Sequence, residues 1–124
     1  MEDKIIKYRS YKDLEVWKLS IELVKEIYRI TEKFPPSEIY GLTNQIRRAA
    51  VSIPSNIAEG QERNSAKEFR QFLAIALGSV AEIETQLIIA KEINYLTEAE
   101  VEPFMASIDR LRKMTRGLIK SING

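Results

Sequence analysis

A run of basic residues near the C-terminus is the part of the sequence best suited to binding chemistry. Residues 110–120 contain five bases and no acid, namely Arg110, Arg112, Lys113, Arg116 and Lys120. Lys113, Arg116 and Lys120 recur at spacings of three and four, so a helix places them on one face. Cations gathered on one face suit contacts to nucleic-acid phosphates. Arg47 and Arg48 are two further candidates for such contacts.

Helix electrostatics offers a second explanation of the same residues. Residues 97–109 hold four acids and no base, namely Glu98, Glu100, Glu102 and Asp109. Acids at the N-terminus of a helix and bases at its C-terminus complement the helix dipole, each contributing about 0.3–1 kcal/mol. The charge segregation therefore predicts either a phosphate-binding face or a helix stabilised by its own end charges.

The aromatic side chains on the apolar stripes are expected inside the protein, which leaves no exposed aromatic platform. Those on apolar stripes are Trp17, Phe69, Phe72 and Phe104. Proteins that bind single strands stack bases on exposed aromatic rings. We therefore expect phosphate contacts without base specificity.

The composition leaves few groups for catalysis. The 124 residues include no His and no Cys, which removes the commonest general base, thiolate nucleophiles and the usual zinc ligands. Neither a G-x-x-x-x-G-K-[ST] phosphate loop nor an S-x-x-K pair occurs. Carboxylates do pair at helical spacing, as in Glu22 with Glu26 and Glu98 with Glu102, but such pairs are typical of solvated faces. We expect no enzyme activity, cofactor, metal or small-molecule substrate.

Length and charge indicate one soluble domain. The chain is 44% hydrophobic and 30% charged, and its net charge is +1, so polyanion binding must rest on local clusters. The longest apolar run, residues 72–77, is too short to span a membrane, and the first seventeen residues lack a secretory apolar segment. We expect a cytoplasmic protein with no membrane segment, made of an N-terminal extension (1–10) and a single domain (11–124).

Apolar residues recur at alternating spacings of three and four in four segments, which is the period of helices. The expected helices span about residues 11–34, 37–60, 65–93 and 97–122. Short loops between long amphipathic segments make neighbouring helices antiparallel. The sequence therefore predicts an all-α, up-down-up-down four-helix bundle.

Local signals mark the ends of these helices. Ser37 is a candidate N-cap, Gly60 a candidate C-cap, and Asn94 a candidate left-handed stop. Two further sequences predict capping boxes: S-x-x-E starting at Ser65 and T-x-x-E starting at Thr97. In a capping box, the side chain of each of the two residues accepts a hydrogen bond from the backbone N–H of the other.

Two prolines fall inside the expected helices. Pro54 lacks a backbone N–H, and we expect it to bend the second helix near Ser52 without breaking it. Pro103 lies six residues past Thr97, so either the fourth helix begins later or its first turns are distorted.

Two segments carry more apolar or small residues than one bundle core needs. The first helix has one seam of Leu14, Trp17, Ile21, Val24, Tyr28 and Thr31, and a second of Val16, Ser20, Leu23, Ile27, Ile30 and Phe34. Small residues crowd the middle of the third helix, where Gly78 costs about 1 kcal/mol relative to alanine. This glycine indicates either a close neighbouring backbone or drift at a tolerant position. Deep burial in a monomer or contact with another copy would explain these features, and we expect a homo-oligomer.

Two motifs make the sequence recognisable. S-I-P-x-N-I-A-E-G spans residues 52–60 with Arg63 following, and A-x-G-S-x-x-E-x-E spans residues 76–84. Together with LEVW at 14–17 and Phe34-Pro35, they resemble, over about residues 11–96, the four-helix-bundle family of proteins encoded in intervening sequences of bacterial 23S ribosomal RNA genes. The motif positions are also candidate interface residues: Pro54, Asn56, Glu59, Gly60, Arg63, Gly78 and Ser79.

The resemblance implies a bundle that assembles into a barrel-like homopentamer, without enzyme activity. It also implies kinship with the accessory protein of diversity-generating retroelements, which binds nucleic acid and a reverse transcriptase. Two functions stay open: an oligomer that binds RNA or DNA through its bases, and a scaffold that docks a partner such as a reverse transcriptase without binding nucleic acid. A third interpretation is that the protein is a passenger encoded by a selfish genetic element and has no strong molecular task.

Overall fold

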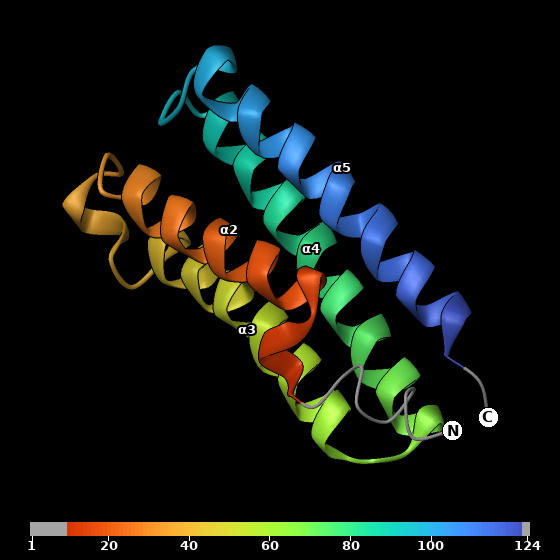
Figure 1. Ribbon diagram of the computed structural model, residues 1–124. Coiled ribbons are helices and arrows are strands. Elements are labelled where there is room, and N and C mark those ends of the chain that lie inside the picture. The colour runs from red at the N-terminus through yellow and green to blue at the C-terminus, as the bar shows by residue number, and fades with distance from the viewer. Residues whose placement is uncertain (1–9, 123–124) are drawn as a thin grey trace.

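The computed structural model of the chain describes residues 10–122 and consists of four long helices (Figure 1). They are α2 (Glu15–Thr31), α3 (Leu42–Glu62), α4 (Ala66–Glu92) and α5 (Glu98–Ser121), and short 3-10 turns η1 (Tyr11–Asp13) and η2 (Pro36–Glu38) precede α2 and α3. Successive helices run antiparallel, and residues 10–122 form no strand. The all-α four-helix bundle is thus confirmed. Of the N-terminal extension expected at 1–10, all but Ser10 lies outside the described residues.

The order of the helices around the bundle follows their order in the chain. α3 packs against α2 and α4, and α5 packs against α4 and closes the bundle on α2. α2 and α4 therefore stand at diagonal corners, as do α3 and α5. Each helix keeps one side facing outward.

Only one of the two seams of α2 lies in the core. The buried seam consists of Val16, Ser20, Leu23, Ile27 and Phe34. Between residues 17 and 28 the other seam is half-buried or exposed, and it consists of Trp17, Ile21, Val24 and Tyr28. Within one copy of the chain, the outward seam is thus an apolar surface that no other element covers completely.

The start of α3 differs from the expectation that Ser37 is an N-cap. Ser37 lies in η2, and α3 begins five residues later at Leu42. The Glu38 carboxylate accepts hydrogen bonds from the Leu42 N–H (2.9 Å) and the Tyr95 hydroxyl (2.7 Å). These bonds lower the pKa of Glu38, and the bond to Glu38 raises the pKa of Tyr95. A carboxylate from the loop therefore replaces the expected serine and ties two loops together at one end of the bundle.

The end of α3 also differs from expectation, because Gly60 is not a C-cap. α3 continues to Glu62, and the left-handed residue is Asn64, with φ of 56°. A Cβ atom at Gly60 would lie 2.6 Å from the Cβ of Phe72, so glycine is needed there for the packing of α3 on α4. Asn94, with φ of 68°, follows α4 in the left-handed conformation as predicted.

Both predicted capping sequences cap their helices, but only one forms the reciprocal box. Thr97 accepts from the Glu100 N–H (3.2 Å), and Glu100 accepts from the Thr97 N–H (2.8 Å). Ser65 accepts from the Glu68 N–H (3.2 Å), whereas the Glu68 carboxylate pairs with Arg63 (3.4 Å). At the start of α4 the serine side chain alone therefore provides the cap.

Both internal prolines lie within continuous helices. α3 remains helical across Pro54, so the proline does not break it. α5 begins at Glu98 and carries Pro103 inside it, so the helix does not start later than its Thr97 cap.

α4 is apolar on more than one side. An 18-residue window within its 27 residues has a mean hydropathy of 1.6, which by length and composition alone would suffice to cross a membrane. Packed core helices pass the same test, and α4 packs against both α3 and α5. Only 39% of that window is buried, so part of the apolar surface of α4 faces outward.

Candidate nucleic-acid interface

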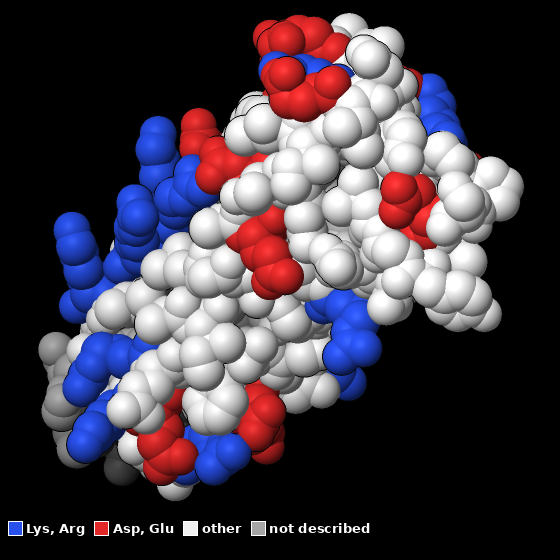
Figure 2. Space-filling view, turned by 180° about the vertical axis from the view of Figure 1, so that it is seen from behind, with Lys and Arg blue, Asp and Glu red and all other residues white. Residues whose placement is uncertain are grey.

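Four bases of the last helix project from the outward side of α5. Its inward side consists of Val101, Phe104, Ile108, Leu111 and Thr115. The outward bases are Arg110, Lys113, Arg116 and Lys120, which we call the basic face. All four are exposed, and none forms an ion pair with a described residue. Figure 2 shows Lys and Arg side chains gathered along the edge of the molecule where α5 runs.

Arg112 differs from the other bases of α5. Its Nη2 donates to a Glu84 carboxylate oxygen at 2.5 Å and its Nη1 to Asp109 at 2.9 Å. Two carboxylates thus compensate its charge, and the Glu84 contact fastens α5 to α4. Arg112 therefore serves helix packing more than the basic face.

Arg70 of α4 is a further base near the basic face, and the spacing of bases along a single helix does not predict it. Its Nη1 donates to the backbone carbonyl of Ile122 at 3.2 Å, just past the end of α5. Arg70 lies there because α4 and α5 are antiparallel, which brings the start of α4 beside the end of α5. Arg70 adds a half-buried cation near the end of α5.

Arg47 and Arg48 lie on α3, diagonal to α5, so one copy does not bring them to the basic face. Arg47 donates from Nε to the Thr31 hydroxyl (2.9 Å) and from Nη2 to the Tyr28 carbonyl (3.3 Å). Its guanidinium also lies 4.6 Å from the centroid of the Tyr28 ring. Arg47 thus holds α3 to the end of α2, whereas Arg48 is exposed.

Replacing Arg47 with alanine should lower the free energy of unfolding by about 1–2 kcal/mol, because two hydrogen bonds and a cation–π contact are lost. Arg48→Ala should change it by less than about 0.5 kcal/mol, as is usual for an exposed side chain. Urea unfolding followed by circular dichroism at 222 nm measures both. Equal losses in the two variants would contradict the role given to Arg47.

The two family motifs meet where α3 packs on α4. The Ser52 hydroxyl lies 2.5 Å from the Ser79 hydroxyl and 2.7 Å from the Ala49 carbonyl. Because one hydroxyl has one proton, Ser79 donates to Ser52 when Ser52 donates to Ala49. Asn56 donates from Nδ2 to the Ser52 carbonyl (2.7 Å). Ser52, Asn56 and Ser79 line an open hollow of about 460 Å³. The Ser52–Ser79 hydrogen bond joins α3 to α4, whereas the Asn56 bond lies within α3.

The remaining motif residues of α3 have packing roles. Arg63 donates to Glu59 (2.7 Å), which raises the pKa of Arg63, and its guanidinium lies 5.0 Å from the Phe72 ring centroid. Pro54 is buried and lines a groove between α2 and α3. Arg63 thus joins the end of α3 to α4, and Glu59 holds its guanidinium from within α3.

Gly78 has no close neighbour within one copy. A Cβ atom there would meet nothing within 4 Å among the described residues. The close backbone approach expected from the sequence is therefore not made inside the bundle, and approach by another chain remains a prediction.

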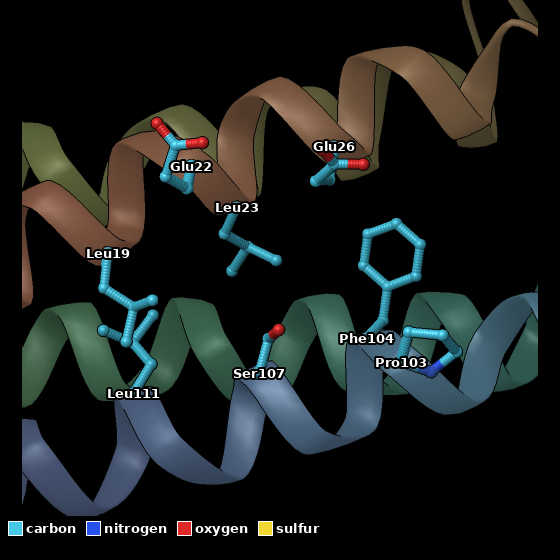
Figure 3. A pocket seen from close by; sticks show the side chains of 8 residues that line it. All are labelled: Leu19, Glu22, Leu23, Glu26, Pro103, Phe104, Ser107 and Leu111. Carbon is cyan, nitrogen blue, oxygen red and sulfur yellow. The ribbon is translucent and has the colours of Figure 1, made fainter.

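A pocket of about 200 Å³ lies between α2 and α5 (Figure 3). Its walls are mostly apolar: Leu19 and Leu111 point toward each other across it, as do Leu23 and Phe104. The Ser107 hydroxyl points from α5 toward α2. The pocket offers apolar surface with one neutral hydroxyl.

The glutamates at the rim of this pocket are already paired with bases. Glu22 pairs with Lys25 (3.2 Å) and Glu26 with Arg29 (2.5 Å), and all four side chains are more than half exposed. Across residues 10–122, no three His, Cys, Asp or Glu side chains are grouped so that they could hold a metal ion. This pocket therefore presents two solvated ion pairs rather than an acid–base pair.

The expectation that aromatic rings stay inside needs correction. Tyr40 in the α2–α3 loop is 93% exposed and Tyr28 is 42% exposed. Trp17, Phe69 and Phe72 are only half-buried, whereas Phe104 is buried. Tyr40 lies at the end of the bundle where α5 begins, so it does not extend the basic face.

Comparisons with known proteins agree with this fold. The family model described as 23S rRNA-intervening sequence protein matches residues 12–117. A solved structure from Bacteroides thetaiotaomicron, described as a protein of unknown function from the S23 ribosomal protein family, is 26% identical with a TM-score of 0.76. That similarity covers 86% of this chain and 99% of the other. No curated protein matches the chain. On the family match, the chain belongs to the 23S rRNA-intervening sequence protein family.

Proposed function

We propose that this protein is a non-enzymatic, oligomeric four-helix bundle that binds RNA or DNA through the basic face of α5. The observation that carries the proposal is that all four cations of this face are exposed and free of ion pairs with described residues. The whole chain has 19 bases and 18 acids, so four unpaired bases on one helix are a local excess. Phosphate groups are the ligands that such an excess attracts.

The helix dipole accounts for only part of this excess. Its effect fades beyond the last turn of a helix, and Lys120 is the only base of the basic face in that turn. Arg110, Lys113 and Arg116 lie before the last turn, so an interaction with the helix dipole does not explain these three bases. Binding of a polyanion gives a role to all four.

Assembly would multiply these contacts. The resemblance to the family implies five copies, and each copy would present the same basic face. The apolar side chains on the outward side of α4 support the oligomer, because extended exposed apolar surface marks interaction sites. The mass of the wild-type protein in solution, measured by light scattering, tests the number of copies.

Reversing three charges of the basic face should weaken binding to every sequence. For the variant K113E/R116E/K120E, the slope of log affinity against log salt should flatten by about 2.7 for a DNA duplex, at about 0.9 per lost phosphate contact. Fluorescence anisotropy with a structured RNA and a matched duplex, at several salt concentrations, measures this.

The matched control reverses three bases of α2 that are each paired with a glutamate three residues earlier. K18E/K25E/R29E changes the net charge equally and should keep most of the slope. A glutamine version of the test variant avoids placing acids at a helix C-terminus, and circular dichroism checks its fold. An unchanged slope in the test variant, or an equal loss in the control, would overturn the basic face as the binding site.

A second function, a scaffold that docks a protein such as a reverse transcriptase, is favoured by one observation. Ile39 and Tyr40 in the α2–α3 loop are 49% and 93% exposed. Large apolar and aromatic side chains of this kind are common anchors in protein interfaces. Under this function, the wild type would ignore nucleic acid at physiological salt, and Tyr40→Ala would weaken capture of the protein partner.

A further inference from the structure

A groove without charged residues runs along the outside of α2 and α3. Its volume is about 330 Å³, and we call it the outer groove. It is lined by Tyr11, Trp17, Ile21, Val24, Val51, Pro54, Ser55 and Ala58. The rings of Tyr11 and Trp17 meet edge to face, 5.4 Å between centroids. The outward seam of α2 thus forms one wall of a concave apolar surface.

A surface of matching apolar character lies on the outward side of α4. Between residues 71 and 89, every exposed residue of this helix except Glu82 is uncharged. The apolar and small members form what we call the outer ridge: Ala74, Ile75, Gly78, Ala81, Thr85, Ile88 and Ile89. Figure 2, seen from behind, shows how little charge the middle of that side of the molecule carries.

The glycine at the centre of the outer ridge is unexplained inside one copy. Nothing lies within 4 Å of the position that a Gly78 Cβ would occupy, yet glycine costs a helix about 1 kcal/mol relative to alanine. Absence of a side chain lets another surface come close to the helix backbone. The ridge is therefore suited to close packing against a concave apolar partner.

We infer that the outer ridge of one copy packs into the outer groove of the next, and that this contact, repeated head to tail, closes a ring. The inference rests on the proposed oligomer and names its two surfaces. The groove lies on the outside of α2 and α3 and the ridge on the exposed outward side of α4, so neither surface covers the other within one copy. A contact between two different surfaces is heterologous, and a ring with an odd number of copies requires contacts of this kind.

The character of both surfaces favours a second copy over other occupants. The residues lining the groove include no charged residue, and the outer ridge itself carries none. Beside the ridge, Arg48 and Glu82 line one hollow together with Ile75, and their opposite charges leave no local excess of cations there to attract phosphate. Burying charged groups is unfavourable, whereas burying apolar surface stabilises a complex. One chain thus carries both an apolar groove and an apolar ridge that could pack into the groove of another copy.

A mixing experiment tests this inference. I75E/I88E places two acids on the ridge, and V51E/S55E places two acids in the groove, all at exposed positions where the monomer fold tolerates them. Each variant alone should be a folded monomer of about the chain mass, 14.3 kDa. Mixed in equal amounts, they should form a heterodimer of about twice that mass, because one ridge and one groove remain intact. Light scattering and native mass spectrometry measure these masses.

The control and the other outcomes separate this inference from the proposed function. A99E/A106E adds two acids on the exposed side of α5 and should assemble like the wild type. Wild-type-like masses of the two interface variants, or a mixture that stays monomeric, would overturn the ridge-and-groove contact while leaving an oligomer in place. A wild type that is monomeric throughout would overturn the oligomer as well. Nucleic-acid binding is read independently from the salt titration.

Discussion

Gly60→Ala is expected to destabilise the bundle, even though alanine is the better helix former. The added Cβ would lie 2.6 Å from the Cβ of Phe72 and 3.2 Å from a ring carbon of Phe69. Because the nearest atom is attached directly to the α4 backbone, the two helices must move apart. Overpacking of this kind typically costs about 1–3 kcal/mol, more than the gain of up to about 1 kcal/mol in helix propensity. The net loss in free energy of unfolding should be about 1–2 kcal/mol.

Gly78→Ala is the matched control for this prediction. The substitution is the same, but nothing lies within 4 Å of the new atom, so the monomer should gain up to about 1 kcal/mol. Both variants are to be compared by urea unfolding in the I75E/I88E background, where assembly does not contribute. Shifts in the same direction for both glycines would contradict the packing described at Gly60.

Ile27→Ala should have a larger effect. Ile27 is fully buried in the core seam of α2, and truncation of such a residue typically costs about 2–5 kcal/mol. Globular domains are stable by about 5–15 kcal/mol, so this loss is a large share of the total. Thermal and urea unfolding of the same monomeric background measure it.

Ile21→Ala provides the comparison, because it makes the same change in the outward seam. Ile21 is half-buried and lines the outer groove, so its loss in the monomer should stay below about 1 kcal/mol. If the outer groove receives the outer ridge of another copy as proposed, Ile21→Ala should also weaken association. Equal destabilisation of the monomer by both substitutions would show that both seams are core.

The number of helices and the ends of α4 and α5 could be predicted because their signals are local. Periodic apolar residues and the caps at Ser65 and Thr97 act within a few positions of each other. The start of α3 could not be predicted in this way. Its N-cap position is Gly41, which has no side chain, and the Leu42 N–H instead donates to the Glu38 carboxylate. That carboxylate is held by Tyr95, 57 residues further along the chain. Long-range contacts of this kind are set by the assembled bundle.

The same distinction applies to the candidate site. The basic face follows from spacing along one helix, so Lys113, Arg116 and Lys120 could be placed together from the sequence. The pairing of Arg112 with Glu84 depends on how α4 and α5 align, and spacing in one helix does not contain it. The steric requirement at Gly60 likewise depends on the separation of α3 and α4, which is why a C-cap was expected there.

The distribution of charge along α5 also acts at a distance. Acids occupy its first half and bases its second, so α5 carries an electric dipole although the whole chain has a net charge of only +1. In a head-to-tail ring every copy has the same orientation along the ring axis, so the axial components of these dipoles add, whereas an antiparallel pair would cancel them. The two rims of the ring would then differ in electrostatic potential, and a polyanion would be steered toward one rim before any contact forms. At physiological salt this steering acts over about 8 Å.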